Sequence, residues 1–177
     1  MGNKISVIIP HYPFDEDINR TLKKCVGSLS GYHELIVVVN SGTGFAKAVN
    51  QGLSLATGDY LMVVNNDIEW KRGTLIELCD PQAVTSPTVN KQSQPFWGCF
   101  FVIPRHVYET VGGLDEQFGI GYFEDDDYMI RLRAANVEMR CVPKCDIATE
   151  GAKTMARFDR AAIMEENRDK FNRKWNI

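Results

Sequence analysis

The residues with the greatest capacity for chemistry are four contiguous acids in the stretch YFEDDDYMIRLR, namely Glu124, Asp125, Asp126 and Asp127. Adjacent carboxylates repel one another, and this crowding raises the proton affinity of at least one of them, as a general base requires. A structural role is the alternative, because acids favour the first turn of a helix and Asp127 can pair with Arg131 one turn later. A structural role accounts for two of the acids, but it does not account for four contiguous ones. The run is therefore either a charged helix start or part of a reaction centre.

Polar residues also follow three predicted strands at the point where each strand ends. These tips are PHYPF at 10–14, NSGTG at 40–44 and NND at 65–67. Ligands of open α/β sheets bind at the carboxyl ends of the strands. One polar tip is only a turn signal, but three at the same edge of a sheet predict a site.

Two of these tips have a functional and a structural interpretation. NSGTG could expose backbone N–H groups to a phosphate, but it lacks the ending of a P-loop. Lys47 also stands where a dinucleotide fingerprint has its third glycine, so a tight turn is favoured. Asp67 offers a hard oxygen ligand for Mg²⁺ or Mn²⁺, and an Asx-turn is its structural alternative.

Hydrophobic periodicity predicts a parallel α/β core in the first half of the chain. Strands at 5–9, 34–39 and 59–67 alternate with helices that begin near Asp15 and Phe45. The stretch ELIVVV at 34–39 is apolar on both faces, which is typical of a central parallel strand.

The second half has a less regular pattern. The elements expected there are a short helix over LIELC, a polar loop at 80–95, strands at 96–103 and 138–143, a helix from Glu124 to Ala135 and a helical tail from about Ala156. No repeat or low-complexity linker divides the chain, so we expect one domain.

Composition excludes several classes of function. The 177 residues are 44% hydrophobic and 24% charged, as in ordinary globular proteins, and a net charge of -3 gives no basis for nucleic-acid binding. No apolar run is long enough to span a bilayer and no export signal is visible, so we expect a cytoplasmic protein without a transmembrane segment. The five cysteines and three histidines are scattered, which favours reduced thiols over a zinc site.

Taken in order, these pieces resemble the family 2 glycosyltransferases with the GT-A fold, most closely their rhamnosyltransferase-like branch. The matching segments are SVIIPHY, GFAKAVNQG, GDYLMVVNND, the stretch from GCFFVIP to EMRCVP, and NRDKFNRKW in the tail. The resemblance implies a mostly parallel sheet flanked by helices, in a shortened form. It also implies one domain over 1–177, with a nucleotide half at 1–70, an acceptor half at 71–155 and a C-terminal helix at 156–177.

The resemblance further implies a reaction and its residues. Family members transfer a hexosyl or deoxyhexosyl group, with inversion, from a nucleotide-diphosphate-sugar to a carbohydrate or glycan hydroxyl, as in polysaccharide biosynthesis, assisted by Mn²⁺ or Mg²⁺. Asp125 corresponds to the base and Asp67 to the metal ligand, while Glu150 stands near the place of a metal-binding histidine. The implied donor-binding residues are Pro10, His11, Tyr12, Asn40, Gly44, Lys47, Asn50, Asn65 and Asn66, and the implied acceptor-binding residues are Trp97, Gly98 and Glu124.

Three departures from the family pattern keep other hypotheses open. Asn40 replaces a usual aspartate, the connection from 34–39 to GFAKA is short, and no histidine follows the last strand. A degenerate GT-A-like module that binds a glycan or protein partner is therefore the main alternative. An oxidoreductase that uses SGTG for a dinucleotide is a further one, which Lys47 disfavours.

Overall fold

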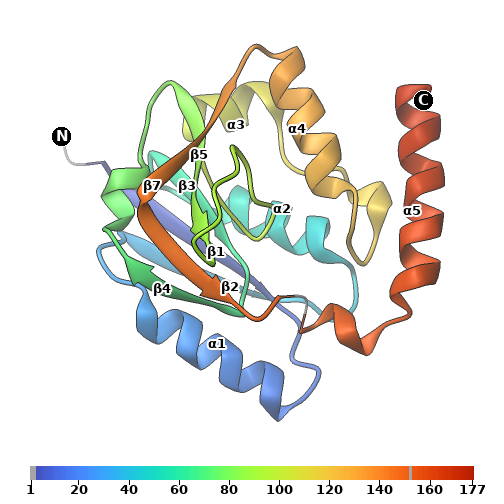
Figure 1. The fold of residues 1–177 in the computed structure, drawn as a ribbon, viewed down its shortest axis with the longest axis horizontal. Helices are drawn as coiled ribbons and strands as arrows, with labels where there is room; N and C mark the ends of the chain where they lie inside the picture. The colour runs from blue at the N-terminus through green and yellow to red at the C-terminus, as the bar shows by residue number, and fades with distance from the viewer. Residues whose placement is uncertain (1–2, 152) are drawn as a thin grey trace.

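The computed structural model describes residues 3–151 and 153–177, whose strands form one seven-stranded sheet in the order β2-β1-β3-β6-β5-β7-β4 (Figure 1). The strands are β1 Ile5–His11, β2 Glu34–Val39, β3 Tyr60–Val64, β4 Ile68–Arg72, β5 Ala83–Val89, β6 Phe100–Pro104 and β7 Glu138–Thr149. The α-helices are α1 Glu16–Ser28, α2 Phe45–Leu55, α3 Arg105–Val111, α4 Glu124–Ala134 and α5 Arg160–Trp175. Short 3₁₀ turns are η1 Leu75–Leu78, η2 Glu116–Phe118 and η3 Met155–Arg157.

The pairing of the strands confirms the α/β class but gives a mixed sheet instead of a mostly parallel one. β1 pairs in parallel with β2 and β3, and β5 pairs in parallel with β7. The β3–β6, β4–β7 and β5–β6 pairs are antiparallel. Residues 90–99 between β5 and β6 are too few for the crossover that parallel neighbours require, so that pair runs antiparallel.

β2 lies at the edge of the sheet, which corrects the expectation of a central strand. Val39 is 65% exposed, and Val37 is exposed as well. Residues 40–44 join β2 directly to α2 without an intervening strand, and β1 is the only described strand that pairs with β2. Apolar residues on both faces therefore did not imply neighbours on both edges.

β5 is a fully buried strand in the segment predicted as a polar loop. The Thr85 and Thr88 hydroxyls donate to the carbonyls of Leu78 and Cys145, so these polar side chains are satisfied in the interior. Pro87 stands at an irregularity of the ladder, where a missing N–H is tolerated.

The sheet separates two hydrophobic cores. Side chains alternate along β1, so Val7 belongs to one core and Ile8 to the other. Cys25 of α1 joins the first core, whereas Val49 of α2 and Leu132 of α4 join the second. Figure 1 accordingly shows α1 on one side of the sheet and α2, α3 and α4 on the other.

Two α-helices, α1 and α5, begin at capping side chains. The Asp15 carboxylate caps α1 by accepting the Ile18 N–H at 2.9 Å, as its position before the helix predicted. α5 is capped by Asp159 and lies beside α4 at the margin of the molecule (Figure 1). Within the described ranges, no helix is both long and apolar enough to cross a lipid bilayer.

Candidate active site

The three polar strand tips and the acidic run meet around one cavity of about 240 Å³. The predicted site residues that line it are Pro10, His11, Tyr12, Asn40, Gly44, Asn65, Asn66, Asp67, Gly98, Glu124 and Asp125. The strand ends and the first turn of α4 thus converge from separate parts of the chain, as ligand sites of α/β folds do.

The β1 tip is held by a buried histidine. The Asn66 Nδ2 amide donates to His11 Nδ1 at 2.9 Å, and His11 Nε2 donates to Asn19 Oδ1 at 3.0 Å. Both ring nitrogens are therefore engaged in joining the β1 and β3 tips to α1. Beside this pair, the Tyr12 ring packs on Phe158 with 5.9 Å between centroids and forms an aromatic wall.

The β2–α2 connection is a tight turn organised by Asn40. Its Oδ1 accepts the N–H groups of Gly42 and Thr43 at 3.0 and 2.8 Å, and its Nδ2 donates to the Gly44 carbonyl at 2.9 Å. Gly44 has φ +104°, and a Cβ there would lie 2.0 Å from the Gly119 carbonyl oxygen. Only glycine permits this backbone and this approach, so NSGTG is a turn that also forms part of the cavity wall.

Asp67 has the properties of a cation ligand. Burial raises the pKa of its carboxyl, and Oδ2 accepts the Lys153 N–H at 3.4 Å. Oδ1 is buried and finds no hydrogen-bond partner among the described residues. A buried carboxylate oxygen without a partner is costly, and a bound cation removes that cost.

The donor set fits one class of metal. The described residues contain no group of three His, Cys, Asp or Glu side chains that could hold an ion by themselves. Where Mg²⁺ or Mn²⁺ also binds substrate phosphates, the protein usually provides one or two carboxylates, and Asp67 can provide one. Glu150, the other predicted ligand, is exposed, pairs with Lys153 Nζ at 2.8 Å and is not among the residues that line the cavity.

Glu124 and Asp125 present carboxyl groups with raised pKa values to the cavity. Burial and then the charge of Asp125 raise the pKa of Glu124 to about 8. Burial and then the charge of Asp126 raise the pKa of Asp125. The Asp125 carboxylate lies so close to Gly98 that a Cβ on this glycine would be 2.5 Å from Oδ2. Perturbed carboxyl groups in a cavity are typical of proton transfer.

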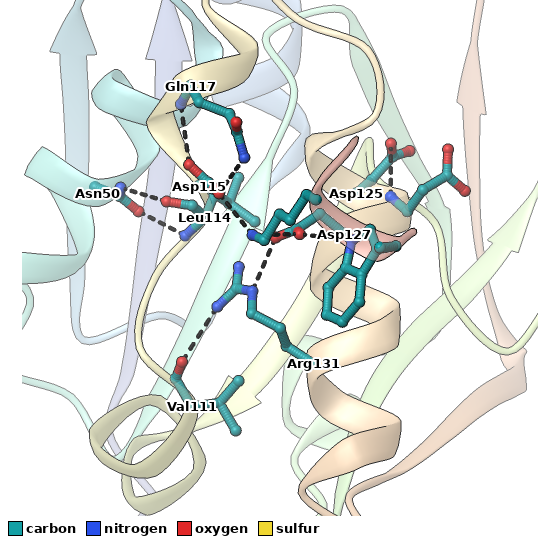
Figure 2. Close-up of polar contacts among 11 residues, drawn as sticks. Asn50, Val111, Leu114, Asp115, Gln117, Asp125, Asp127 and Arg131 are labelled. Atoms are coloured by element: carbon teal, nitrogen blue, oxygen red, sulfur yellow. Dashed lines mark hydrogen bonds and ion pairs between the residues drawn. The ribbon is translucent and has the colours of Figure 1, made fainter. Parts of the chain in front are cut away.

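Asp127 faces away from the cavity and holds the helix. It is fully buried, and its Oδ2 accepts Arg131 Nε at 2.8 Å, which confirms the predicted pair. Its Oδ1 accepts Trp175 Nε1 at 3.1 Å and Lys174 Nζ at 2.5 Å from α5. Figure 2 shows Asp125 on the other side of the same helical turn. Asp126 is exposed, so the four acids divide among three environments.

Three predicted ligand-binding residues lie elsewhere. Lys47 is exposed on α2. Asn50 bonds to both backbone groups of Leu114 at 2.8 Å, so its amide joins α2 to the loop before η2 (Figure 2). Trp97 lines a second cavity of about 270 Å³, which shares Asn65 and Asp67 with the first.

Two further segments line the cavity and were not predicted as parts of the site. Ile120, Gly121 and Tyr122 line the cavity just before the acidic run, and the glycines of FGIGYF were the available signal. Thr154, Met155 and Phe158 also line it, and no pattern marked them.

Family models identify the chain. Residues 15–109, more than half of its 177 residues, match the model Glycosyl transferase family 2. The chain belongs to glycosyl transferase family 2. Residues 82–156 of this family 2 chain also match the model described as the N-terminal domain of galactosyltransferase. No curated protein matches it by sequence.

Solved structures share the fold of the family 2 chain. GalNAc-T7 with UDP, GalNAc and Mn²⁺ aligns with a TM-score of 0.69 at 14% identity, over 83% of this chain and 43% of that one. The catalytic domain of Drosophila β1,4-galactosyltransferase 7 with xylobiose aligns with a TM-score of 0.62 at 16% identity, over 86% of this chain and 67% of that one. The mannosyltransferase PcManGT from Pyrobaculum calidifontis with GDP-Man and Mn²⁺ aligns with a TM-score of 0.63 at 17% identity, over 86% of this chain and 58% of that one. The GT-A fold is thus shown, and the chain spans less than half the length of GalNAc-T7.

Proposed function

We propose that this family 2 domain transfers a sugar from a nucleotide-diphosphate-sugar to an acceptor hydroxyl, with inversion. The observation that carries the proposal is one cavity lined by both an unpartnered Asp67 oxygen and the raised-pKa carboxyls of Glu124 and Asp125. Transfer from a diphosphate needs a cation for the leaving group and a base for the nucleophile, and these residues can supply both.

The strand tips form the donor side of the cavity. Tyr12 and Asn40 would border the nucleotide, and Asn65 and Asn66 would flank the phosphates beside Asp67. Asp67 would hold Mn²⁺ or Mg²⁺, which neutralises the developing charge of the diphosphate. The similar structures of GalNAc-T7 and PcManGT contain Mn²⁺ with UDP and with GDP-Man, respectively, which supports this assignment.

Asp125 is the better of the two candidate bases. With a pKa of about 8, the Glu124 carboxyl is mostly protonated near neutral pH. A neutral Glu124 adds no second like charge to that of Asp126, so it does not oppose the ionisation of Asp125 further. Asp125 would then take the acceptor hydroxyl proton while the new glycosidic bond forms and the bond from the anomeric carbon to phosphate breaks. One displacement of this kind inverts the anomeric centre.

The donor is proposed to carry a hexosyl or deoxyhexosyl group, and the acceptor to be a carbohydrate. Trp97 gives the second cavity an aromatic ring beside Asn65 and Asp67, a combination of an apolar face and polar groups that suits a sugar. The buried indole Nε1 has no partner among the described residues, so it can donate to a ligand hydroxyl.

A binding module without turnover is the second candidate. The observation in its favour is that Glu150 pairs with Lys153 and does not line the cavity, so Asp67 is the only one of the two predicted metal ligands that does. Such a module would bind a nucleotide-sugar or glycan and would not depend on Asp125.

The test measures nucleotide diphosphate release from UDP-, GDP- and dTDP-sugars with Mn²⁺, with and without EDTA. We expect metal-dependent hydrolysis of at least one donor. Asp125→Asn should lower this rate by about 100-fold or more, the usual contribution of a general base, whereas exposed Asp126→Asn should leave it within about twofold. Binding without release would favour the binding module. Absence of binding to every donor, or equal effects of the two variants, would contradict the proposal.

A further inference from the structure

The loop before the two cavity carboxyls has a backbone that needs outside support. Residues Gly119, Gly121, Tyr122 and Phe123 have φ values of +61°, +156°, +72° and +73°. Left-handed conformations are disfavoured for aromatic residues and persist only where the surrounding structure holds them. Phe123 is also the N-cap of α4 and provides no side-chain cap. The position of Glu124 and Asp125 therefore depends on what holds the loop at 118–123.

One buried side chain of α5 holds this loop. Asn167 is 2% exposed, and its Nδ2 donates to the carbonyls of Phe118, Gly121 and Tyr122 at 2.6, 2.8 and 3.3 Å. Its Oδ1 accepts Lys170 Nζ at 3.1 Å. An amide of this length provides two donor hydrogens and an acceptor at one point, which neither a carboxylate nor a hydroxyl can do.

Three further contacts connect the loop to α5 and to α2. The Phe171 ring packs on Phe118 and Phe123, with centroid distances of 6.4 and 5.4 Å. The Phe45 N–H at the start of α2 donates to the Ile120 carbonyl at 3.3 Å. Asn167 itself does not line the cavity, so it can act on the site only through the loop.

We propose that Asn167 is a positioning residue, which holds the loop at 118–123 in its left-handed conformation and thereby directs Asp125 into the cavity. The catalytic part of this inference rests on the proposed function. The C-terminal helix thus completes the site from outside it, because three carbonyls converge on a single amide. Removing the amide leaves these carbonyls without their shared donor and releases the first turn of α4.

The experiment compares the full chain with Asn167→Ala by three readouts. Amide hydrogen exchange within 118–123 should become about tenfold faster, while exchange in β1 and β3 stays unchanged. The Glu124 carboxyl, followed by ¹³C NMR, should titrate at least about one pH unit below its wild-type value, because it gains water. If a donor is turned over, kcat should fall by about tenfold and the KM for the donor should stay within about threefold.

Ile147→Val provides the control for general loss of stability. Ile147 is fully buried in the first core, which Cys25 of α1 also joins. Its truncation should therefore leave hydrogen exchange in the loop and the titration of Glu124 unchanged. Lys170→Met keeps Asn167 but removes the partner of its Oδ1, together with the bond from Lys170 Nζ to the Gln117 carbonyl at 2.9 Å, and it should produce the same changes in smaller size. If Asn167→Ala does not fold, the same measurements on Lys170→Met test the inference.

Unchanged loop exchange in Asn167→Ala, or equal changes in Ile147→Val, would overturn the inference. Absence of turnover in the wild type would contradict the proposed function instead, and the exchange and titration readouts would still decide the role of Asn167.

Discussion

Replacing Glu124 by glutamine should stabilise the protein by an amount that grows with pH. Glu124 is 8% exposed as a residue, and its Oε2 has no hydrogen-bond partner in the described part of the chain. Burial and the charge of Asp125 raise its pKa from 4.5 to about 8. The folded protein therefore binds the Glu124 proton more tightly than the unfolded chain does.

The sign and the size of the effect follow from this difference. Between pH 4.5 and about 8 the carboxyl is protonated in the folded protein and ionised in the unfolded chain, so the free energy of unfolding falls as the pH rises. At about 1.4 kcal/mol for each pH unit, the loss over this interval is up to roughly 5 kcal/mol. Glutamine fills the same space and cannot ionise, so Glu124→Gln should escape the loss.

Urea denaturation followed by tryptophan fluorescence, at pH values from about 5 to about 8, measures this difference. The stability advantage of Glu124→Gln over wild type should increase by roughly 4 kcal/mol across that range. Glu109→Gln changes an exposed acid of α3 and should differ from wild type by a constant amount. A constant or shrinking advantage of Glu124→Gln would refute the reasoning, because it would mean that Glu124 is already ionised in the folded protein.

Two further substitutions test the contacts that hold α4 and α2, both by the free energy of unfolding in urea. Asp127→Ala should lower it by about 3 kcal/mol because two cations lose their buried partner, whereas Glu69→Ala in an exposed pair should change it by less than about 0.5 kcal/mol. Equal losses of unfolding free energy in the two variants would mean that the buried pairs of Asp127 stabilise the protein no more than an exposed pair does. Gly44→Ala should lower the free energy of unfolding by about 2 kcal/mol, since its Cβ would meet the Gly119 carbonyl at a positive φ. Gly27→Ala, which has open space around it in α1, should raise the free energy of unfolding by about 0.5 kcal/mol. A stable Gly44→Ala would show that the two loops can separate without cost.

The acidic run shows how far residue types and spacing can be interpreted alone. The i,i+4 spacing predicted the ion pair of Asp127 with Arg131, because a helix brings such residues to one face whatever lies around it. Order along the chain also predicted that Asp67 and Asp125 belong to one site, and both line the same cavity. The partners of Asp127 on α5 could not be predicted, because they lie 47 and 48 positions away.

Two strands show where local pattern fails. β5 has the proline, serine and threonine content of a loop, yet it lies between β6 and β7 and its hydroxyls bond to buried carbonyls. β2 has the composition of a central strand, yet it forms the edge of the sheet. Burial depends on which strands become neighbours, and strand composition does not specify neighbours.

By itself, the sequence determined the features that depend on neighbours along the chain. These are the start of α1 at Asp15, the polar tips of β1, β2 and β3, and the order of motifs that identifies the family. Only the tertiary structure decided which of these residues share a cavity and which protons they hold. Lys47 and Asn50 follow the NSGTG turn but lie outside the cavity, whereas Asn167 reaches the loop beside it from the last helix. The reason is physical: the shift of a pKa and the conformation of a loop depend on burial and on contacts between distant segments, and these arise only when the chain folds.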